Sequence, residues 1–214
     1  MATSAREAIL AGIRSALGAQ APDPAAEWAA IARDYRRGGT MPLKQRLELL
    51  EDRLRDYDAG VYLASHAEVP ALIARILGER GKHVMALPDN FPPAWLPAGV
   101  RFVPDTRTSI AEIDACQGVL TTATLAIALT GTIILQDSPG QGRRAVTLLP
   151  DYHLCIVDTA TIVETVPEAI SLLQPTATKA TTFFSGPSAT ADIEMTRIKG
   201  VHGPRFVDVI LAGD

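Results

Sequence analysis

The chain has 214 residues and a formal net charge of −4, and this mild acidity excludes the basic surface needed to bind nucleic acid or an anionic membrane. It has only two cysteines, Cys116 and Cys155, and no Cys-x-x-Cys motif, which excludes a disulfide framework, a bound iron–sulfur cluster and a cysteine-based zinc site. No apolar stretch approaches the roughly 18 residues of a membrane span, and the first residues do not resemble a secretion signal, so we expect a cytoplasmic protein without membrane insertion.

The N-terminal quarter of the chain is predicted to be a helical extension. Apolar residues recur at helical spacing from about residue 4 to residue 17, and again from residue 43 to residue 57. Between these segments, residues 19–41 contain several prolines and glycines and show no sustained period, which favours a flexible linker, although Trp28, Ile31 and Tyr35 within it could still form a helix turn. We therefore predict an extension at 1–57 and a separate α/β domain at 58–214.

After Gly60, short apolar runs alternate with helical patterns, which is typical of βαβ units. The predicted elements are strands at 61–64, 83–87, 100–103 and 118–120, and helices at 67–77 and 109–116. Such an order favours an α/β fold in which a mostly parallel sheet is flanked by helices.

The stretch 121–135 is predicted to contain a compact, helix-like apolar run and then a strand at 132–135. Gly131, at the junction, suits an unusual backbone angle or a close approach to another segment. The hydroxyls of Thr130 and Thr132 could line a polar pocket beside it, although threonines are also ordinary at strand ends. We take these three residues as candidate ligand-binding residues.

Residues 137–144, Asp-Ser-Pro-Gly-Gln-Gly-Arg-Arg, are predicted to form a loop between two strands. Gly140 and Gly142 leave backbone N–H groups accessible, and the guanidinium groups of Arg143 and Arg144 follow directly. Such a loop can bind a carboxylate or a phosphate, although a hairpin turn with solvated arginines would have the same composition. It is not a nucleotide-binding fingerprint, because it lacks both the P-loop lysine and a third glycine before a helix.

Downstream, the apolar runs 145–149 and 154–157 are predicted to continue the sheet, and 168–173 to form a short helix. Between the two runs lies a turn that carries His153. This histidine could face a functional site or simply the solvent.

The segment 183–204 carries much of the polar chemistry of the C-terminal half. Its pattern predicts a strand, a turn, a helix from about Ser188, and a second turn before a last strand at 207–211. This arrangement would bring hydroxyls, carboxylates and an imidazole to one sheet edge, where α/β proteins bind small anions, although ordinary helix capping would use the same residues. The candidate ligand-binding residues are Gly186, Ser188 and Thr190, and the candidate catalytic residues are Asp192, Glu194 and His202. Because the histidines and carboxylates lie on separate segments, no metal site is predicted.

Two parts of this segment together resemble the C-terminal signature of the lactate utilization protein C family, which is defined by the LUD domain. They are Gly-Pro-Ser-Ala-Thr-Ala-Asp-Ile-Glu at 186–194 and Gly-Val-His-Gly-Pro at 200–204. The resemblance continues through Leu-Thr-Gly-Thr-Ile-Ile-Leu at 129–135 and Leu-Leu-Pro-Asp-Tyr-His at 148–153, and it covers at least residues 117–211. The chain departs from the family at Leu129, where members commonly carry an acidic residue.

This resemblance implies a NagB/RpiA/coenzyme A transferase-like fold and a part in the oxidation of L-lactate to pyruvate beside iron–sulfur partner proteins. Because the chain lacks cluster-binding cysteines, it would carry no cofactor, and the iron–sulfur clusters would lie on partner subunits. It would bind a small anionic metabolite, with His202 as a candidate proton-transfer group. Two alternatives stay open: a free-standing enzyme acting on a phosphorylated or coenzyme-bearing small molecule, and a non-catalytic ligand-binding or interaction protein. The sequence does not predict the oligomeric state.

Overall fold

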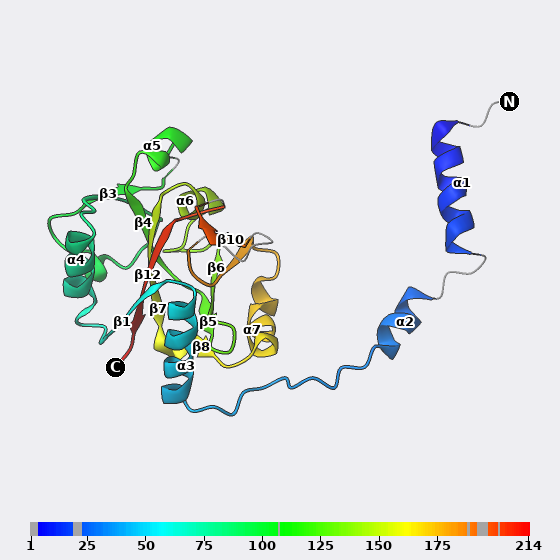
Figure 1. The fold of residues 1–214 in the computed structure, drawn as a ribbon, viewed down its shortest axis with the longest axis horizontal. Coiled ribbons are helices and arrows are strands. Elements are labelled where there is room, and N and C mark those ends of the chain that lie inside the picture. The colour runs from blue at the N-terminus through cyan, green and yellow to red at the C-terminus, as the bar shows by residue number, and fades with distance from the viewer. Residues whose placement is uncertain (1–3, 19–22, 107, 188, 192–196, 201) are drawn as a thin grey trace. The chain divides into compact units, whose positions relative to one another are not determined.

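The computed structural model describes most of the chain and divides it into two units (Figure 1). The described residues are 4–18, 23–106, 108–187, 189–191, 197–200 and 202–214. The first unit comprises residues 1–36, and the second comprises residues 37–214. All the strands described belong to the second unit.

The first unit contains two helices. Helix α1 (Ala5–Leu17) is confirmed, and it begins with a capping box. In this box the Ser4 hydroxyl accepts a hydrogen bond from the Glu7 N–H at 3.3 Å, and the Glu7 carboxylate accepts one from the Ser4 N–H at 2.8 Å. Helix α2 (Pro24–Ala30) lies within the predicted linker 19–41, and its initial proline suits a helix start. It contains Trp28, one of the three residues that could form a helix turn within the linker. Neither α1 nor α2 contains a buried residue.

Six parallel strands form the main sheet of the described second unit, in the order β1-β12-β7-β4-β2-β3. They are β1 (Gly60–Ala64), β2 (Val84–Leu87), β3 (Arg101–Pro104), β4 (Gly118–Thr122), β7 (Tyr152–Asp158) and β12 (Phe206–Ala212). Several read as continuous apolar runs because both faces of a parallel sheet are covered. The predicted α/β class, with a mostly parallel sheet flanked by helices, is confirmed.

Helices pack on both faces of the main sheet (Figure 1). The helices of this unit are α3 (Leu43–Asp56), α4 (Val69–Glu79), α5 (Ile110–Asp114), α6 (Arg144–Leu148) and α7 (Val166–Leu173). Ile73 of α4 belongs to the same buried cluster as Leu154 of β7, whereas Leu50 of α3 belongs to the cluster of the next β7 residue, Cys155. Successive strand residues point to opposite faces, so α4 and α3 lie on opposite sides of the sheet.

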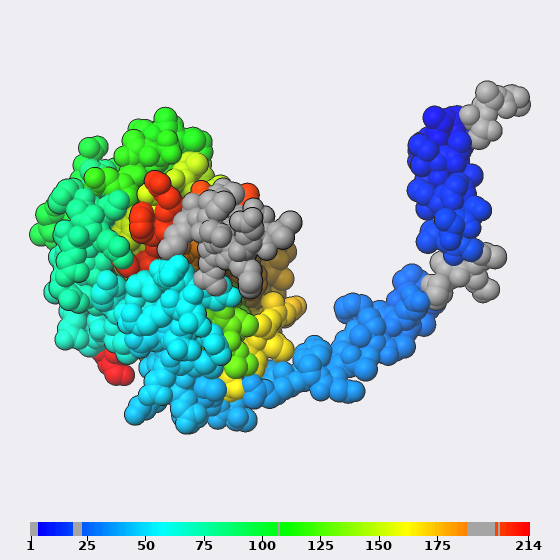
Figure 2. Space-filling model, viewed as in Figure 1, coloured from blue at the N-terminus to red at the C-terminus, as the bar shows by residue number. Residues whose placement is uncertain are grey.

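Helix α3 belongs to the second unit, although the sequence predicts a domain boundary at 57/58. Leu50 and Leu54 are fully buried in a core cluster that also contains Val209 of β12. In the space-filling view, α3 covers the front of this unit (Figure 2). The division falls at 36/37 instead, because the apolar stripe of α3 packs on the sheet.

A second sheet has the order β8-β5-β6-β9 and consists of β5 (Leu125–Ile127), β6 (Thr132–Gln136), β8 (Ile162–Val163) and β9 (Thr181–Phe184). The strand predicted at 132–135 is confirmed, but the helix-like run before it is wrong. Leu125 pairs with Ile134 in an antiparallel hairpin that turns at Gly131, where φ is +62°. Because every residue of β5 is buried, its sequence shows no alternation that would mark a strand.

The helix predicted from Ser188 is also wrong where the structure describes it. Strands β10 (Ala189–Ala191) and β11 (Arg197–Lys199) form a separate antiparallel pair, in which Thr190 lies opposite Ile198. The polar residues that suggest a helix cap suit a strand end equally well. Asp192 and Glu194 lie outside the described residues.

The apolar run 145–149 forms most of helix α6 instead of the predicted strand. Val146 packs in one buried cluster with Ile113 of α5 and Val119 of β4. A run of this length is too short for periodicity to separate a helix from a strand. The described part of the chain also has short 3-10 helices, namely η1 (Pro93–Trp95), η2 (Thr159–Thr161) and η3 (Gln174–Thr176). No helix among the described residues has the length and apolar character to cross a membrane.

Candidate functional site

The predicted site residues that the structure describes lie in three places. A cavity of about 250 Å³, here called the amino-end cavity, lies beside the starts of β7 and β12 and borders β9. An open pocket of about 830 Å³, the carboxyl-end pocket, lies beyond the ends of β2 and β3. The third place is the turn between β5 and β6. Ser188, Asp192 and Glu194 lie outside the described residues, and Thr190 is described only as the paired residue of β10.

The amino-end cavity brings together segments that are distant in sequence. Its polar lining residues are Arg144, Thr147, His153, Thr182, Ser185 and His202, and its wall includes Gly186. Arg144, Gly186 and His202 were all predicted as site residues, so the structure unites the loop before α6 with both turns of the C-terminal segment. The cavity lies at the amino ends of the strands, whereas α/β sheets more often bind ligands beyond the carboxyl ends.

Arg144 supplies the positive charge of the amino-end cavity. Its Nη1 donates to the Thr147 carbonyl at 3.3 Å and to the Thr147 hydroxyl at 3.1 Å, and its Nη2 lies 3.4 Å from the His202 carbonyl. Arg144 is exposed as a whole residue, but partial desolvation of its guanidinium lowers its pKa; an arginine nevertheless remains charged. Among the described residues, its guanidinium forms no ion pair with a carboxylate. A partly desolvated cation of this kind favours a bound anion.

His153 forms a buried part of the cavity wall and is only 3% exposed. Its Nε2 lies 2.7 Å from the Thr121 hydroxyl, and its ring centroid lies 5.3 Å from that of Phe184. Burial, with a smaller effect from the charge of Arg144, lowers the pKa of His153 to about 3. The imidazole is therefore neutral at physiological pH. The sequence left open whether His153 faces the site or the solvent, and the structure shows that it faces the site. The signal in the sequence that could have indicated this is a polar residue next to an apolar strand.

Gly186 and His202 shape the mouth of the cavity. Gly186 has a φ of +140°, and a Cβ there would lie 2.7 Å from Tyr57 Cβ and 2.8 Å from the Tyr57 carbonyl oxygen. Glycine is therefore required by both the backbone angle and the close approach of α3. His202 is exposed and lines the cavity, so it can reach solvent and a bound molecule; its catalytic role stays a prediction.

Thr130, Gly131 and Thr132 do not line either pocket. Gly131 approaches α3, where a Cβ would lie 2.5 Å from Arg53 Cβ. The Thr130 hydroxyl lies 2.8 Å from that of Thr132, which lies 3.1 Å from the Ser185 hydroxyl. Ser185 lines the amino-end cavity, so these threonines connect to the cavity only through a chain of hydroxyl groups. We infer a supporting role for them.

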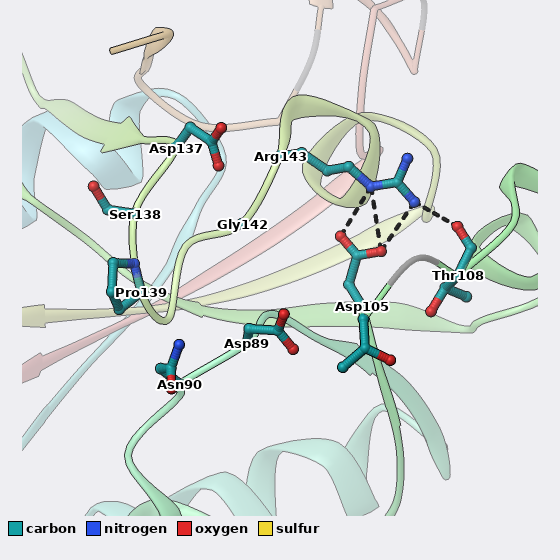
Figure 3. Close-up of a pocket in the computed structure, with 10 residues that line it drawn as sticks. Asp89, Asn90, Asp105, Thr108, Asp137, Ser138, Pro139, Gly142 and Arg143 are labelled. Atoms are coloured by element: carbon teal, nitrogen blue, oxygen red, sulfur yellow. Dashed lines mark hydrogen bonds and ion pairs between the residues drawn. The ribbon is translucent and has the colours of Figure 1, made fainter.

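The carboxyl-end pocket lies at a topological switch point, because β3 and β4 lie on opposite sides of β2. Its lining includes Asp89, Asp105, Asp137, Gly142 and Arg143 (Figure 3). Gly140 does not line the pocket, but its N–H donates to the carbonyl of the lining residue Asp89 at 2.7 Å, and its carbonyl accepts from the Thr122 N–H at 2.8 Å. Of the two glycines of the predicted anion loop, Gly142 therefore lines this pocket and Gly140 is bonded beside it.

Arg143 faces a carboxylate in the carboxyl-end pocket (Figure 3). Its Nε lies 3.0 Å and its Nη2 2.9 Å from oxygens of Asp105, and Nη2 also donates to the Thr108 carbonyl at 2.5 Å. Asp105 raises the pKa of Arg143. With Asp89 and Asp137 beside this pair, the lining is negative and unfavourable for an anion. Arg143 and Arg144, predicted to act together, thus belong to different pockets.

The comparisons with known proteins agree on one family. The family model described as the LUD domain matches residues 47–212. The lactate utilization protein C of Deinococcus radiodurans is 42% identical over 170 residues, which cover 78% of this chain and 79% of that protein. The protein of the same name from Bacillus subtilis is 34% identical over 129 residues, about half of each chain (52% and 53%).

Structure leads to the same result. The crystal structure of a DUF162 family protein from Deinococcus radiodurans matches with a TM-score of 0.71 and 35% identity, covering 81% of this chain and 100% of that one. The family model extends from α3 to β12 and so includes the whole sheet and the amino-end cavity. The chain belongs to the LUD domain family.

Proposed function

We propose that this protein binds a small carboxylate in the amino-end cavity and acts as a component of a system that oxidises L-lactate to pyruvate. The observation that carries the proposal is Arg144, a partly desolvated cation that lines a small cavity and forms no ion pair with a described carboxylate. A carboxylate there would gain charge-assisted hydrogen bonds from the guanidinium. The names of the relatives supply the choice of lactate.

The size of the cavity supports a small ligand. Its volume of about 250 Å³ lies below the roughly 300–1,000 Å³ of sites for drug-sized molecules. A carboxylic acid of a few carbon atoms fits such a volume, whereas a coenzyme would extend far outside it. This favours a lactate-like anion over the coenzyme-bearing ligand of the alternative hypothesis.

Oxidation of lactate removes one hydrogen from the carbon that carries the hydroxyl and one from the hydroxyl itself, which is two electrons and two protons in all. We propose that the electrons pass to iron–sulfur proteins, because the two cysteines of this chain, Cys116 and Cys155, are both buried and too few to hold a cluster. His202, at the mouth of the cavity, is the candidate to accept the hydroxyl proton. The partner subunits would complete the electron path.

Binding of L-lactate and pyruvate, measured by calorimetry, tests the carboxylate site. Loss of a charged hydrogen-bond donor costs about 1.5–3 kcal/mol, so Arg144→Ala should weaken binding by about tenfold or more. The matched control is Arg143→Ala, because that neighbouring arginine pairs with Asp105 in the other pocket. Equal losses in both variants, or none in Arg144→Ala, would contradict the assignment.

The proposed partners need a separate test. The tagged full-length chain would be captured from cells growing on lactate, and the captured fraction assayed for iron and for lactate-dependent reduction of a dye. We expect iron–sulfur proteins and activity in the same fraction. Recovery of a single iron-free chain would remove the partner subunits from the proposal and leave the carboxylate site to be judged by calorimetry.

A further inference from the structure

His153 holds a fixed position in the wall of the amino-end cavity. It is the second residue of β7, and its backbone lies between Val207 of β12 and Val119 of β4. The contact with Phe184 and the hydrogen bond to Thr121 hold the ring from two sides. Because the strand is central and the ring is buried, its orientation has little freedom.

The hydrogen bonding of the ring leaves one nitrogen for the cavity. Nε2 is 2.7 Å from the Thr121 hydroxyl, and among the described residues Nδ1 has no partner. Nδ1 is not among the fully enclosed polar atoms without a partner in the described part of the chain, so it is open to the cavity that the ring lines, where a ligand atom can take the place of water. The burial that lowers the pKa of His153 to about 3 keeps this nitrogen from carrying a full positive charge.

We infer that His153 selects carboxylates that carry an oxygen on the neighbouring carbon, by a hydrogen bond between Nδ1 and that 2-hydroxy or 2-oxo oxygen. The inference rests on the proposed function, in which Arg144 binds the carboxylate itself. The two residues line the same cavity, one supplying charge and the other a neutral polar contact. His153 is therefore a specificity-determining residue, distinct from the proton-transfer role proposed for His202.

Because Nε2 is bonded to a hydroxyl, the same histidine can bind both the 2-hydroxy acid and its oxidised 2-oxo form. A threonine hydroxyl can donate or accept a hydrogen bond, so the Thr121–His153 pair is compatible with either imidazole tautomer. With the proton on Nδ1, the ring donates to the carbonyl of a 2-oxo acid. With the proton on Nε2, Nδ1 accepts from the hydroxyl of a 2-hydroxy acid. A ligand that lacks this oxygen leaves Nδ1 unpaired, which a buried site penalises.

Calorimetry on the full-length protein with L-lactate, pyruvate and propionate tests the inference. Propionate keeps the carboxylate and the chain length but lacks the second oxygen. We expect the wild-type protein to prefer lactate and pyruvate over propionate by about tenfold, the effect of one hydrogen bond. In His153→Phe the ratio of lactate or pyruvate affinity to propionate affinity should fall to nearly one, while the propionate affinity stays within about twofold of the wild-type value.

A second variant keeps the imidazole and removes only its buried partner. Thr121→Val should reduce the preference for both oxygenated ligands, even if His153→Phe proves too unstable to assay. Thermal melting of each variant reports whether it is folded. Equal wild-type affinity for all three ligands, or a preference that both variants retain, would overturn the role of His153 while the carboxylate site stands. If the wild type binds none of them, the proposed function fails first.

Discussion

The amino-end cavity and the carboxyl-end pocket lie near opposite ends of strands in the main sheet and use consecutive arginines in opposite ways. In the carboxyl-end pocket Arg143 is paired with Asp105 among further carboxylates. In the amino-end cavity Arg144 contacts carbonyls and a hydroxyl, and it forms no ion pair with a described carboxylate. The larger pocket is therefore the less suited to an anion.

The divergence of the two arginines has a local cause. Arg143 is the N-cap of α6 and has an extended backbone, whereas Arg144 is the first residue of the helix. The two side chains accordingly contact different partners, Asp105 for Arg143 and Thr147 for Arg144. The nearest opposite charge, and not the arginine itself, decides whether such a side chain is available to a ligand.

Both pockets belong to the second unit, so the largest expected effect comes from damaging that unit as a whole. Deleting residues 1–57 removes Leu50 and Leu54, and truncating even one buried leucine costs about 2–5 kcal/mol. It also removes Tyr57, which packs against Gly186 at the amino-end cavity. We expect this protein to lack a cooperative thermal transition.

Deletion of residues 1–36 is the matched control. It ends before the segment in which the Glu164 carboxylate accepts hydrogen bonds from the Thr40 and Met41 N–H groups, at 2.6 and 2.7 Å. The melting temperature should stay close to that of the full chain, because neither α1 nor α2 buries a residue. A large drop on removing 1–36 would show that the first unit supports both pockets.

Two glycine substitutions, one in the wall of the amino-end cavity and one beside the carboxyl-end pocket, can distinguish the two sites by a smaller change. Gly186→Ala places a Cβ 2.7 Å from Tyr57 Cβ at a positive φ, and overpacking with backbone strain should cost about 2–4 kcal/mol and distort the amino-end cavity. Gly140→Ala is similarly strained, with φ at +74° and Thr122 Oγ1 2.8 Å away, but it lies beside the other pocket. Urea unfolding would measure both costs.

The difference between these variants should appear in ligand binding. Lactate affinity should fall in Gly186→Ala and be preserved in Gly140→Ala, measured at a temperature where both are folded. The opposite order would place anion binding at the carboxyl ends of the strands. A third glycine, Gly78, is a control for the substitution itself, because nothing lies within 4 Å of its Cβ position.

The sequence predicts the framework of the second unit well because most of its elements have distinct patterns. The charged and apolar alternation of α3 and the short apolar runs of β1 and β7 allow little ambiguity. Uniform burial removes that information, as in β5, where a strand resembles a short apolar helix. The capping residues around Ser188 mislead for a different reason, since hydroxyls and acids suit both helix starts and turns.

The site was only partly predictable, because contacts between distant segments decide which of the predicted residues come together. Residues 186 and 202 carry local signals, namely a required glycine and a polar residue at a turn. Nothing near Arg143 in the sequence reveals its partner Asp105, which is 38 positions away. The burial of His153 likewise depends on Phe184 and Thr121, which reach it from β9 and β4. These contacts exist only in the folded chain.

Acid should lower the free energy of unfolding through His153, which lies in the wall of the amino-end cavity. The unfolded imidazole has a pKa of about 6.5, and the folded one a pKa of about 3. The unfolded state therefore binds a proton first, so the stability contributed by neutral His153 is complete above pH 6.5 and declines as pH falls toward 3. Between about pH 7 and pH 5 the loss amounts to about 2 kcal/mol.

Urea unfolding at the two pH values measures this loss, and His153→Phe should reduce it by about that amount. His66→Ala is the matched control, because the Asp214 carboxylate raises the pKa of His66, so this histidine favours the folded state as pH falls. An unchanged pH dependence in His153→Phe would mean that the imidazole is accessible to protons in the folded protein.

The smallest effect is expected at the ion pair of the carboxyl-end pocket. Arg143 is exposed, so solvent and salt screen its ion pair in part, although the Asp105 side chain is only 5% exposed; Arg143→Ala should therefore lower the melting temperature less than the changes above. Asp105→Asn should behave in the same way. If Asp105→Asn gains affinity for lactate or phosphate in the calorimeter, the negative lining of this pocket is what excludes anions. If Arg143→Ala instead loses affinity, both arginines serve one ligand, and the separation of the two pockets by charge is wrong.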